Sequence, residues 1–166
     1  MDFRKNIIKN WMHKSKERYE IRDGIGGEFQ FAEILINCWI AFEAYSCLRY
    51  NLDGVQARIN AFCREHAQNY KTDFESLPSD LRENLARLSK HKVHDMRPNH
   101  SSDPPKEIKD GKNLSEIMEV IYQVRNNLFH GGKDVQDIKD RNIIEHSAII
   151  LYRLLERIFH SENYLA

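Results

Sequence analysis

The sequence predicts an all-α fold, a bundle of four to six helices, because apolar residues recur with helical period along most of the chain. The strict alternation of apolar and polar residues that indicates strands is absent. The 166 residues are enough for one domain with a sizeable core, without a disulfide or a metal to hold it. We therefore expect residues 1–166 to form a single helical domain, in which residues 89–112 are a long, irregular and mobile loop.

The first helix is predicted over about 2–20, and the glycines within 24–27 end it. Its inner side carries four apolar residues at helical spacing, Phe3, Ile7, Ile8 and Trp11. Its other side is charged and predicts a solvated face, with Lys14, Lys16, Glu17 and Arg18. This charged beginning argues against a signal peptide.

The second helix, over about 28–48, is apolar on nearly every side, which predicts neighbours around most of its surface. It is long enough to span a bilayer, yet it contains three polar or charged residues, Glu33, Asn37 and Glu43. Such residues are costly in lipid, so we expect a central core helix and no membrane association. Glu43 is either a satisfied polar group at a helix contact or a support for a functional arginine.

Two shorter helices are predicted next. The third spans about 53–70, where Val55, Ile59 and Phe62 fall in step. The fourth spans about 79–88 and has two signals at its beginning. Proline suits a helix start, as at Pro78, and serine is a strong cap, as at Ser79.

Residues 89–112 contain three prolines, a glycine and many polar residues, which predicts irregular structure. They also hold the main basic cluster of the chain, Lys90, His91, Lys92, His94 and Arg97. One interpretation is a solvated loop, and the other is a positive patch beside a nucleic-acid cleft. The loop histidines and Asp95 have metal-ligand chemistry, but no helix fixes them, so we expect no metal site.

The fifth helix is predicted to begin at about Asn113, which is spaced from Glu116 as in a capping box. It runs to about His130, where Gly131 and Gly132 accept the left-handed conformation of a helix end. A last helix over about 137–159 turns one apolar stripe inward, with Ile144, Ala148, Leu151, Leu155 and Ile158.

The overall charge is balanced, with 25 basic and 25 acidic residues and an isoelectric point of about 7.1. This excludes a protein coated in positive charge, so any nucleic-acid contact must come from a local patch. Three cysteines without a CxxC pair indicate a reducing compartment and a cytoplasmic protein. The chain has no glycine-rich phosphate loop, nucleophile elbow or dinucleotide fingerprint, and we expect no cofactor.

The most distinctive chemistry lies in the segment from Arg125 to His130. Arginine can grip a phosphate through a charged fork of donors, and histidine can move a proton near neutral pH. With Ile117 at 0° on a helical wheel, Asn126 and His130 lie at about 180° and 220°, opposite the apolar stripe. Arg125 lies on the flank, at about 80°, and we expect it and His130 to be at a solvent-accessible cleft. The alternative is an ordinary helix end, because a basic residue there interacts well with the helix dipole.

The run Arg125-Asn126-x-x-x-His130-Gly131, on the penultimate helix of a small all-helical domain, resembles the HEPN superfamily. Those domains are helical bundles that share an arginine and a histidine separated by four to six residues. The aromatic residue before the histidine, the glycine after it and the amphipathic final helix are also similar to this group. So is the apolar early helix with an internal glutamate, here Glu43.

The resemblance implies a HEPN-like helical bundle with Arg125 and His130 as the catalytic pair and Asn126 as a supporting polar residue. Many HEPN proteins are metal-independent endoribonucleases of toxin–antitoxin, phage-defence and CRISPR systems, and they dimerise so that two motifs meet in one cleft. Others have lost catalysis and serve as binding modules. Some HEPN toxins carry a tyrosine two positions after the histidine, which a partner nucleotidyltransferase modifies. Gly132 stands there in this chain, which puts control of that type in doubt.

We therefore expect a cytoplasmic homodimer that cleaves RNA in a toxin or phage-defence setting, with an antitoxin or another protein as partner. Glu43 would support Arg125, and the basic loop would contact the RNA through Lys90, Lys92 and Arg97. An imidazole would take the ribose 2′-hydroxyl proton, and cleavage would leave a 2′,3′-cyclic phosphate. The alternatives are a non-catalytic HEPN module that binds a nucleotide, an RNA or a protein, and an unrelated helical interaction protein.

Overall fold

The computed structural model describes residues 3–21, 29–100, 102–130 and 137–165, and these form six α-helices and two 3-10 turns. In chain order they are α1 (Phe3–Glu20), α2 (Gln30–Tyr50), α3 (Val55–Thr72), η1 (Phe74–Ser76), α4 (Ser79–Leu88), η2 (Pro98–His100), α5 (Leu114–Phe129) and α6 (Ile138–Ser161). The all-α prediction is confirmed for these residues. The two glycine-rich helix ends, at 24–27 and 131–132, lie outside the described residues.

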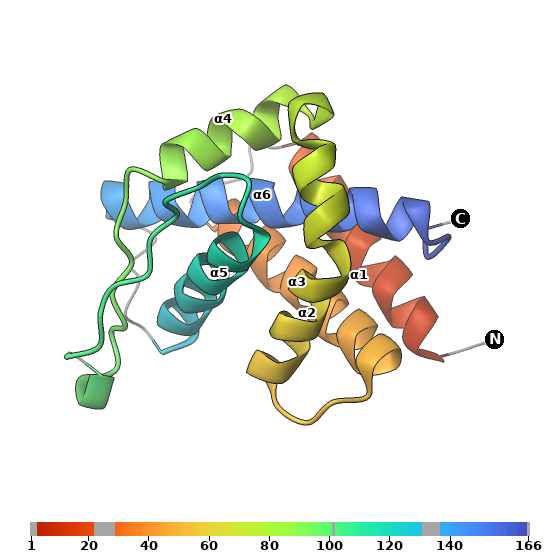
Figure 1. Ribbon diagram of the computed structural model, residues 1–166, viewed down its shortest axis with the longest axis horizontal. Helices are drawn as coiled ribbons and strands as arrows, with labels where there is room; N and C mark the ends of the chain where they lie inside the picture. Colours follow the sequence, from red (N-terminus) through yellow and green to blue (C-terminus); the bar gives the residue numbers. More distant parts are fainter. Residues whose placement is uncertain (1–2, 22–28, 101, 131–136, 166) are drawn as a thin grey trace.

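α6 runs the length of the molecule, with α4 along one side of it (Figure 1). α1 begins and α6 ends at one end of the molecule, and η2 lies at the other end (Figure 1). The predicted helices begin and end within two residues of the observed ones, which is the usual spread for helix ends. The periodicity of apolar residues was therefore enough to place the helices along the chain.

α2 lies in the middle of the bundle, where it packs against α1, α3 and α6. Three of its aromatic residues, Trp39, Phe42 and Tyr45, are almost fully buried. Phe42 meets Phe62 of α3 edge to face, with ring centroids 5.2 Å apart. In the described part of the chain, α2 alone is long and apolar enough to cross a membrane, and half of that stretch is buried against the protein. This packing agrees with the predicted core helix.

The inward face of α1 differs from the prediction. Phe3 is 76% exposed, and the residues that are buried are Ile8, Met12, Ser15 and Tyr19. Ser15 takes one of these inward positions, where its hydroxyl donates to the carbonyl oxygen of Trp11 and accepts from Cys38 Sγ. A serine that bonds to its own helix can be buried, and a pattern of apolar residues alone does not reveal it.

The beginning of α5 follows the prediction in part. The side-chain oxygen of Asn113 accepts hydrogen bonds from the backbone N–H groups of Ser115 and Glu116, as a cap does. The carboxylate of Glu116 turns to the preceding loop, where it accepts from the N–H groups of Lys109 and Asp110 at 2.7 and 3.0 Å. Glu116 therefore ties the end of the loop to the first turn of α5.

The beginning of α4 corrects the prediction for Ser79. Pro78 occupies the cap position without a side-chain hydrogen bond, and Ser79 is the first residue of the helix. Asp80 follows in the first turn, where its carboxylate accepts from the N–H of Leu81 at 2.9 Å. An acidic residue in the first turn complements the helix dipole, and here it takes the place of a serine cap.

Residues 89–113 are irregular, as predicted, but they pack along α5. An isolated antiparallel bridge joins Val93 to Lys106 and turns the segment into a hairpin with η2 at its tip. Val93 and Ile108 are 1% and 4% exposed, so the base of this loop belongs to the hydrophobic core. Lys106 also forms an ion pair with Glu119 of α5 at 2.9 Å. These contacts tie the base of the loop to the core and to α5, which the composition did not predict.

Candidate functional site

The two residues of the predicted pair lie near the end of α5 in different surroundings. The side chain of Arg125 is 25% exposed, and His130 is the exposed residue that ends the helix. Ile117, Ile121 and Val124 are fully buried, so the predicted helical phase is confirmed. The position of His130 away from the core is confirmed with it.

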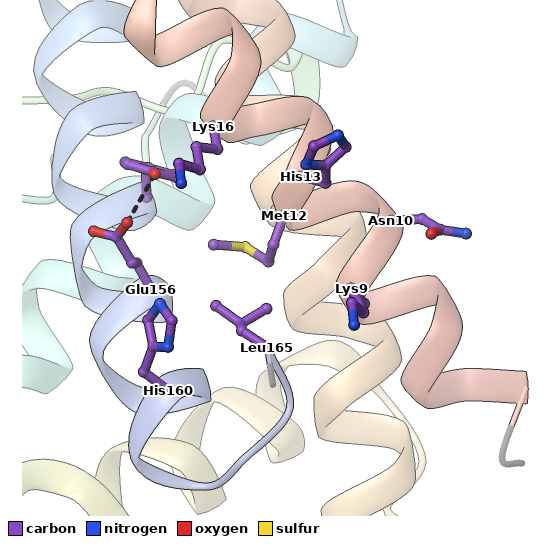
Figure 2. A pocket seen from close by; sticks show the side chains of 9 residues that line it. Lys9, Asn10, Met12, His13, Lys16, Glu156, His160 and Leu165 are labelled. Atoms are coloured by element: carbon purple, nitrogen blue, oxygen red, sulfur yellow. Dashed lines mark hydrogen bonds between the residues drawn. The ribbon is translucent and has the colours of Figure 1, made fainter.

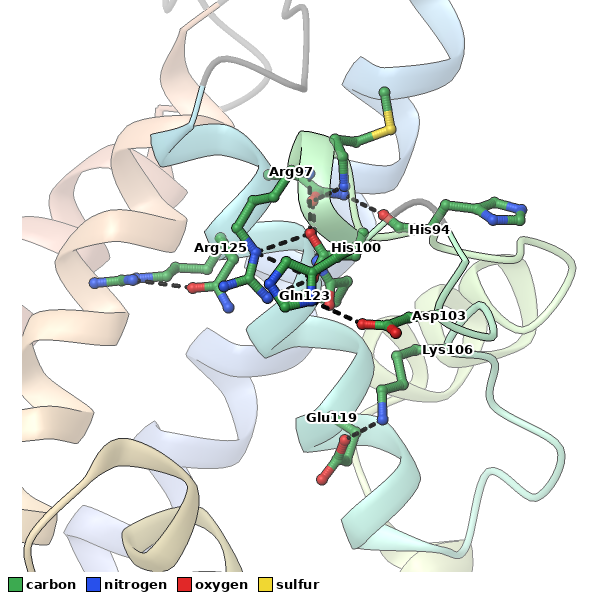
Figure 3. Close-up of polar contacts among 12 residues, drawn as sticks. His94, Arg97, His100, Asp103, Lys106, Glu119, Gln123 and Arg125 are labelled. Atoms are coloured by element: carbon green, nitrogen blue, oxygen red, sulfur yellow. Dashed lines mark hydrogen bonds and ion pairs between the residues drawn. The ribbon is translucent and has the colours of Figure 1, made fainter.

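Arg125 reaches from α5 toward α2. Its Nη2 lies 3.8 Å from Glu43 Oε1, and its Nη1 donates to Asn126 Oδ1 at 3.1 Å. The guanidinium also lies over the rings of Phe129 and Trp39, 4.3 and 5.8 Å from their centroids. Figure 3 shows this side chain directed away from the loop of residues 89–113. Arg125 is therefore oriented by aromatic surfaces and by a carboxylate from another helix.

Most donors of Arg125 are not used by the residues that the structure describes. A guanidinium has five N–H donors, and within the described ranges Arg125 gives one hydrogen bond, the one to Asn126. Its Nε is buried and has no acceptor in that part of the chain. A partly exposed guanidinium with unused donors is suited to bind an anion such as a phosphate.

The contacts of Glu43 fit both interpretations that the sequence left open, a satisfied polar group at a helix contact and a support for an arginine. Its Oε1 accepts from Trp39 Nε1 at 2.7 Å, so it is a satisfied polar group at a helix contact. The same oxygen is the one that faces Arg125, as the 3.8 Å ion pair shows. Trp39 in turn stacks on Tyr122 of α5 with centroids 5.5 Å apart, which fixes the α2 side of the site.

Asn126 and Gln123 lie on the side of α5 opposite the core stripe, but each is only 7% exposed. The loop covers this side. Asn127, which is 1% exposed, donates to the carbonyl oxygen of His94 at 2.7 Å and accepts from the N–H of Met96 at 3.1 Å. Gln123 Nε2 donates to the same Asn127 oxygen at 3.0 Å. The sequence offered one signal for this contact, the run of amide side chains on one side of α5.

The structure separates the three predicted RNA-binding residues. Arg97 is fixed by the carboxylate of Asp95, which accepts from its Nε at 3.0 and 3.1 Å and from its Nη2 at 2.5 Å. These bonds hold the pKa of Asp95 well below its usual range. Lys92 turns to Glu107, 3.5 Å away, and Lys90 lies exposed beyond the end of α4. Of the three, only Arg97 is connected to the α5 contact, because it directly follows Met96.

Two groups of described side chains have metal-ligand atoms within 4.8 Å of one another. They are Glu65, His66 and Glu162, and Asp95, His100 and Asp103. In the first group, Arg49 donates three hydrogen bonds to the carboxylate of Glu65. In the second, Arg97 holds Asp95 in the same way. A carboxylate that is already bound by a guanidinium is poorly suited to hold a cation, so neither group is a ready metal site.

A cavity of about 380 Å³ lies between α1 and α6, and its lining is basic (Figure 2). Four basic side chains surround an apolar floor that includes Met12 and Leu165, namely Lys9, His13, Lys16 and His160. Glu156, which also lines the cavity, is already engaged by the Tyr152 hydroxyl and by Arg153 at 2.9 Å. The charged side of α1 was predicted to be merely solvated, and the cavity was missed because α6 supplies its other wall.

No protein-family model, curated protein sequence or solved structure matches the chain. The geometry of the site is therefore the basis for its interpretation. Arg125, Asn126 and Glu43 form one connected unit, and the exposed His130 follows at the end of the same helix. This arrangement can bind an anion and offer an imidazole to solvent.

Proposed function

We propose that the chain is a metal-independent endoribonuclease of the HEPN type that acts in a toxin or phage-defence setting. The observation that carries the proposal is the Arg125 guanidinium, which is partly exposed and oriented by Glu43 and Asn126, and most of its donors are unused by the described residues. An exposed histidine, His130, follows on the same helix. The motif also lies on the penultimate helix of an all-helical domain, as the resemblance to HEPN domains implies.

In the proposed reaction, His130 takes the proton from a ribose 2′-hydroxyl. The 2′-oxygen attacks the adjacent phosphorus, and Arg125 binds the phosphoryl oxygens as negative charge develops on them. The bond to the 5′-oxygen breaks, and a second imidazole or water gives that oxygen a proton. The products are a 2′,3′-cyclic phosphate and a 5′-hydroxyl. Because DNA lacks the 2′-hydroxyl, it is not a substrate.

We also propose that the protein is a cytoplasmic homodimer in which Asn126 and His130 lie near the two-fold axis. Two exposed apolar side chains near this end of α5 support a partner surface, since Met96 and Phe129 are 52% and 53% exposed. A two-fold axis would bring two copies of the motif together. An antitoxin is the alternative occupant. The three cysteines are free, which agrees with a reducing compartment.

The proposal is tested by incubating the purified protein with mixed RNA and with DNA in the presence of EDTA. We expect cleavage of RNA only, with 2′,3′-cyclic phosphate ends, and loss of cleavage in His130→Ala. Light scattering at micromolar concentration should give the mass of a dimer. A folded wild-type protein that cleaves none of the RNA would overturn the proposal, and a fully active monomer would overturn the dimer.

The basic cavity between α1 and α6 favours a second candidate function, a non-catalytic module that binds a nucleotide or a similar anion. Lys9 and Lys16 supply positive charge there, and Met12 supplies an apolar surface for a base. Calorimetric titration with a mononucleotide tests this function. Binding that is lost in Lys16→Ala and kept in Lys14→Ala, without any RNA cleavage, would make it the better interpretation.

A further inference from the structure

A histidine–carboxylate pair lies at the tip of the loop, outside the motif. His100 Nδ1 is 2.9 Å from Asp103 Oδ2, and the side chain of His100 is 40% exposed. When Nδ1–H donates to a carboxylate, the other ring nitrogen, Nε2, is left to accept or give a proton. An exposed pair of this kind contributes little to the free energy of unfolding. Whether it has a function therefore depends on what lies near it.

The loop tip is held beside the last turns of α5. Asn127 donates to the carbonyl oxygen of His94 and accepts from the N–H of Met96, immediately before η2. Within that turn, the N–H of His100 donates to the carbonyl oxygen of Arg97 at 3.0 Å. Figures 1 and 3 both place η2 near the end of α5 where the helix stops. The His100 pair is therefore attached to the same end of the molecule as the motif.

Arg97 brings a second guanidinium to this end of α5. It is fixed by Asp95, whose side chain is only 6% exposed. Arg97 directly follows Met96, whose N–H donates to Asn127 of α5, so Arg97 lies close to this helix. Arg125 reaches toward α2, on the other side of α5 (Figure 3). The side of α5 that carries Asn126 thus has one guanidinium on each flank.

The proposed cleavage needs a proton donor for the leaving oxygen as well as a base, and one imidazole cannot easily be both in the same step. We propose that His100 is the second proton-transfer group, the general acid that protonates the leaving 5′-oxygen, and that Arg97 binds the neighbouring phosphate. This inference rests on the proposed ribonuclease function. Asp103 is the positioning residue, because it orients the ring. A single chain then supplies both imidazoles.

The step balances in protons and bonds. The 2′-oxygen gives its proton to His130 and forms a new bond to phosphorus. The bond from phosphorus to the 5′-oxygen breaks, and that oxygen takes the Nε2 proton of His100. One histidine has gained a proton and the other has lost one, and exchange with water restores both.

The test compares ordinary RNA with RNA in which sulfur replaces the bridging 5′-oxygen at one site. A thiolate is a good leaving group and needs no proton, so it bypasses a general acid. We expect His100→Ala to slow the cleavage of ordinary RNA by about 100-fold or more and to cleave the sulfur substrate at a rate close to that of the wild type. His130→Ala should be slow on both substrates. His94→Ala, which removes another exposed histidine of the same loop, is the matched control and should be unchanged.

Asp103→Asn keeps the size of the side chain and removes the charge. It therefore tests the role of the carboxylate beside His100 without leaving a gap there. We expect a smaller loss on ordinary RNA and the same rescue by sulfur. If His100→Ala cleaves ordinary RNA as fast as the wild type, the inference is overturned and the proposed function stands. Equal impairment of His100→Ala on both substrates also overturns it. A wild-type protein that cleaves neither substrate overturns the inference and the proposed function together.

Discussion

The two sides of α5 hold their arginines by different means. On the α2 side, Arg125 lies against the rings of Trp39 and Phe129 and faces Glu43, a carboxylate from a helix that is distant in sequence. On the loop side, Arg97 is held by Asp95, two residues before it in the chain. The first arrangement depends on the packing of two helices, and the second depends on where the loop lies.

The position of the loop beside α5 depends largely on one side chain, that of Asn127. Asn127 makes hydrogen bonds to His94, Met96 and Gln123, and it is 1% exposed. Loops are usually the least precise place for a functional residue, and buried hydrogen bonds are one way to make them precise. We therefore expect the α2 side to tolerate substitutions that the loop side does not.

The largest expected effect on RNA cleavage comes from His130, at the end of α5. His130→Ala should reduce RNA cleavage by about 100-fold or more if His130 transfers a proton. Its free energy of unfolding should change by less than about 0.5 kcal/mol, because the side chain is exposed. Initial rates and urea denaturation measure the two quantities, with His160→Ala as an exposed histidine control. An unfolded His130→Ala protein would show that the histidine is structural.

Asn127→Ala should release the loop from α5 and leave the contacts between α2 and α5 unchanged. It removes the hydrogen-bond partners of the Met96 N–H and the His94 carbonyl oxygen, which are partly buried, so it should cost about 1–2 kcal/mol of unfolding free energy. Hydrogen exchange at Met96 should become faster, while the amides of α2 should keep their protection until the protein unfolds globally. Asn99→Ala, an exposed asparagine in the same loop, is the control. Unchanged exchange at Met96 would mean that apolar contacts at the base hold the loop.

Glu43→Gln examines the α2 side alone and should have a modest effect. The ion pair with Arg125 joins partly exposed groups 3.8 Å apart, so its loss is worth about 1 kcal/mol or less, about fivefold in rate. Glutamine keeps an oxygen that accepts from Trp39, so thermal stability should be nearly unchanged. Steady-state kinetics distinguish the outcomes. A loss as large as that of His130→Ala would contradict a purely orienting role for Glu43.

The smallest expected effect is the pH dependence of the loop-side pair. Hydrogen bonds from Arg97 hold the pKa of Asp95 well below its usual range of about 3.9. A lowered pKa in the folded state means that the pair stabilises the protein above about pH 4 and ceases to do so as the pH falls toward the lowered value. Carbon-detected NMR of the Asp95 carboxyl should show it ionised where ordinary aspartates titrate. In Arg97→Ala the midpoint should rise toward about 3.9, and an unchanged midpoint would assign the shift to the backbone N–H alone.

The helices could be placed from the sequence because the period of apolar residues is a local property. The inward face of α1 was predicted only in part, and one of its members, Ser15, is buried through bonds to Trp11 and Cys38 that no apolar pattern reveals. The loop was a harder case. Composition predicted that residues 89–112 are irregular, but neither the bridge between Val93 and Lys106 nor the contact with Asn127 follows from it.

The sequence by itself determined the all-helical class, the helix that carries Arg125 and His130, and the outward direction of His130. Helical geometry fixes the direction of every side chain once a few apolar residues on the same helix are known to be buried. Only the tertiary structure decided which groups surround those two residues. Arg125 meets Glu43 through the crossing of α2 and α5, and Arg97 and His100 approach α5 through hydrogen bonds across a long loop. Such contacts join residues far apart in the chain, and no local pattern encodes them.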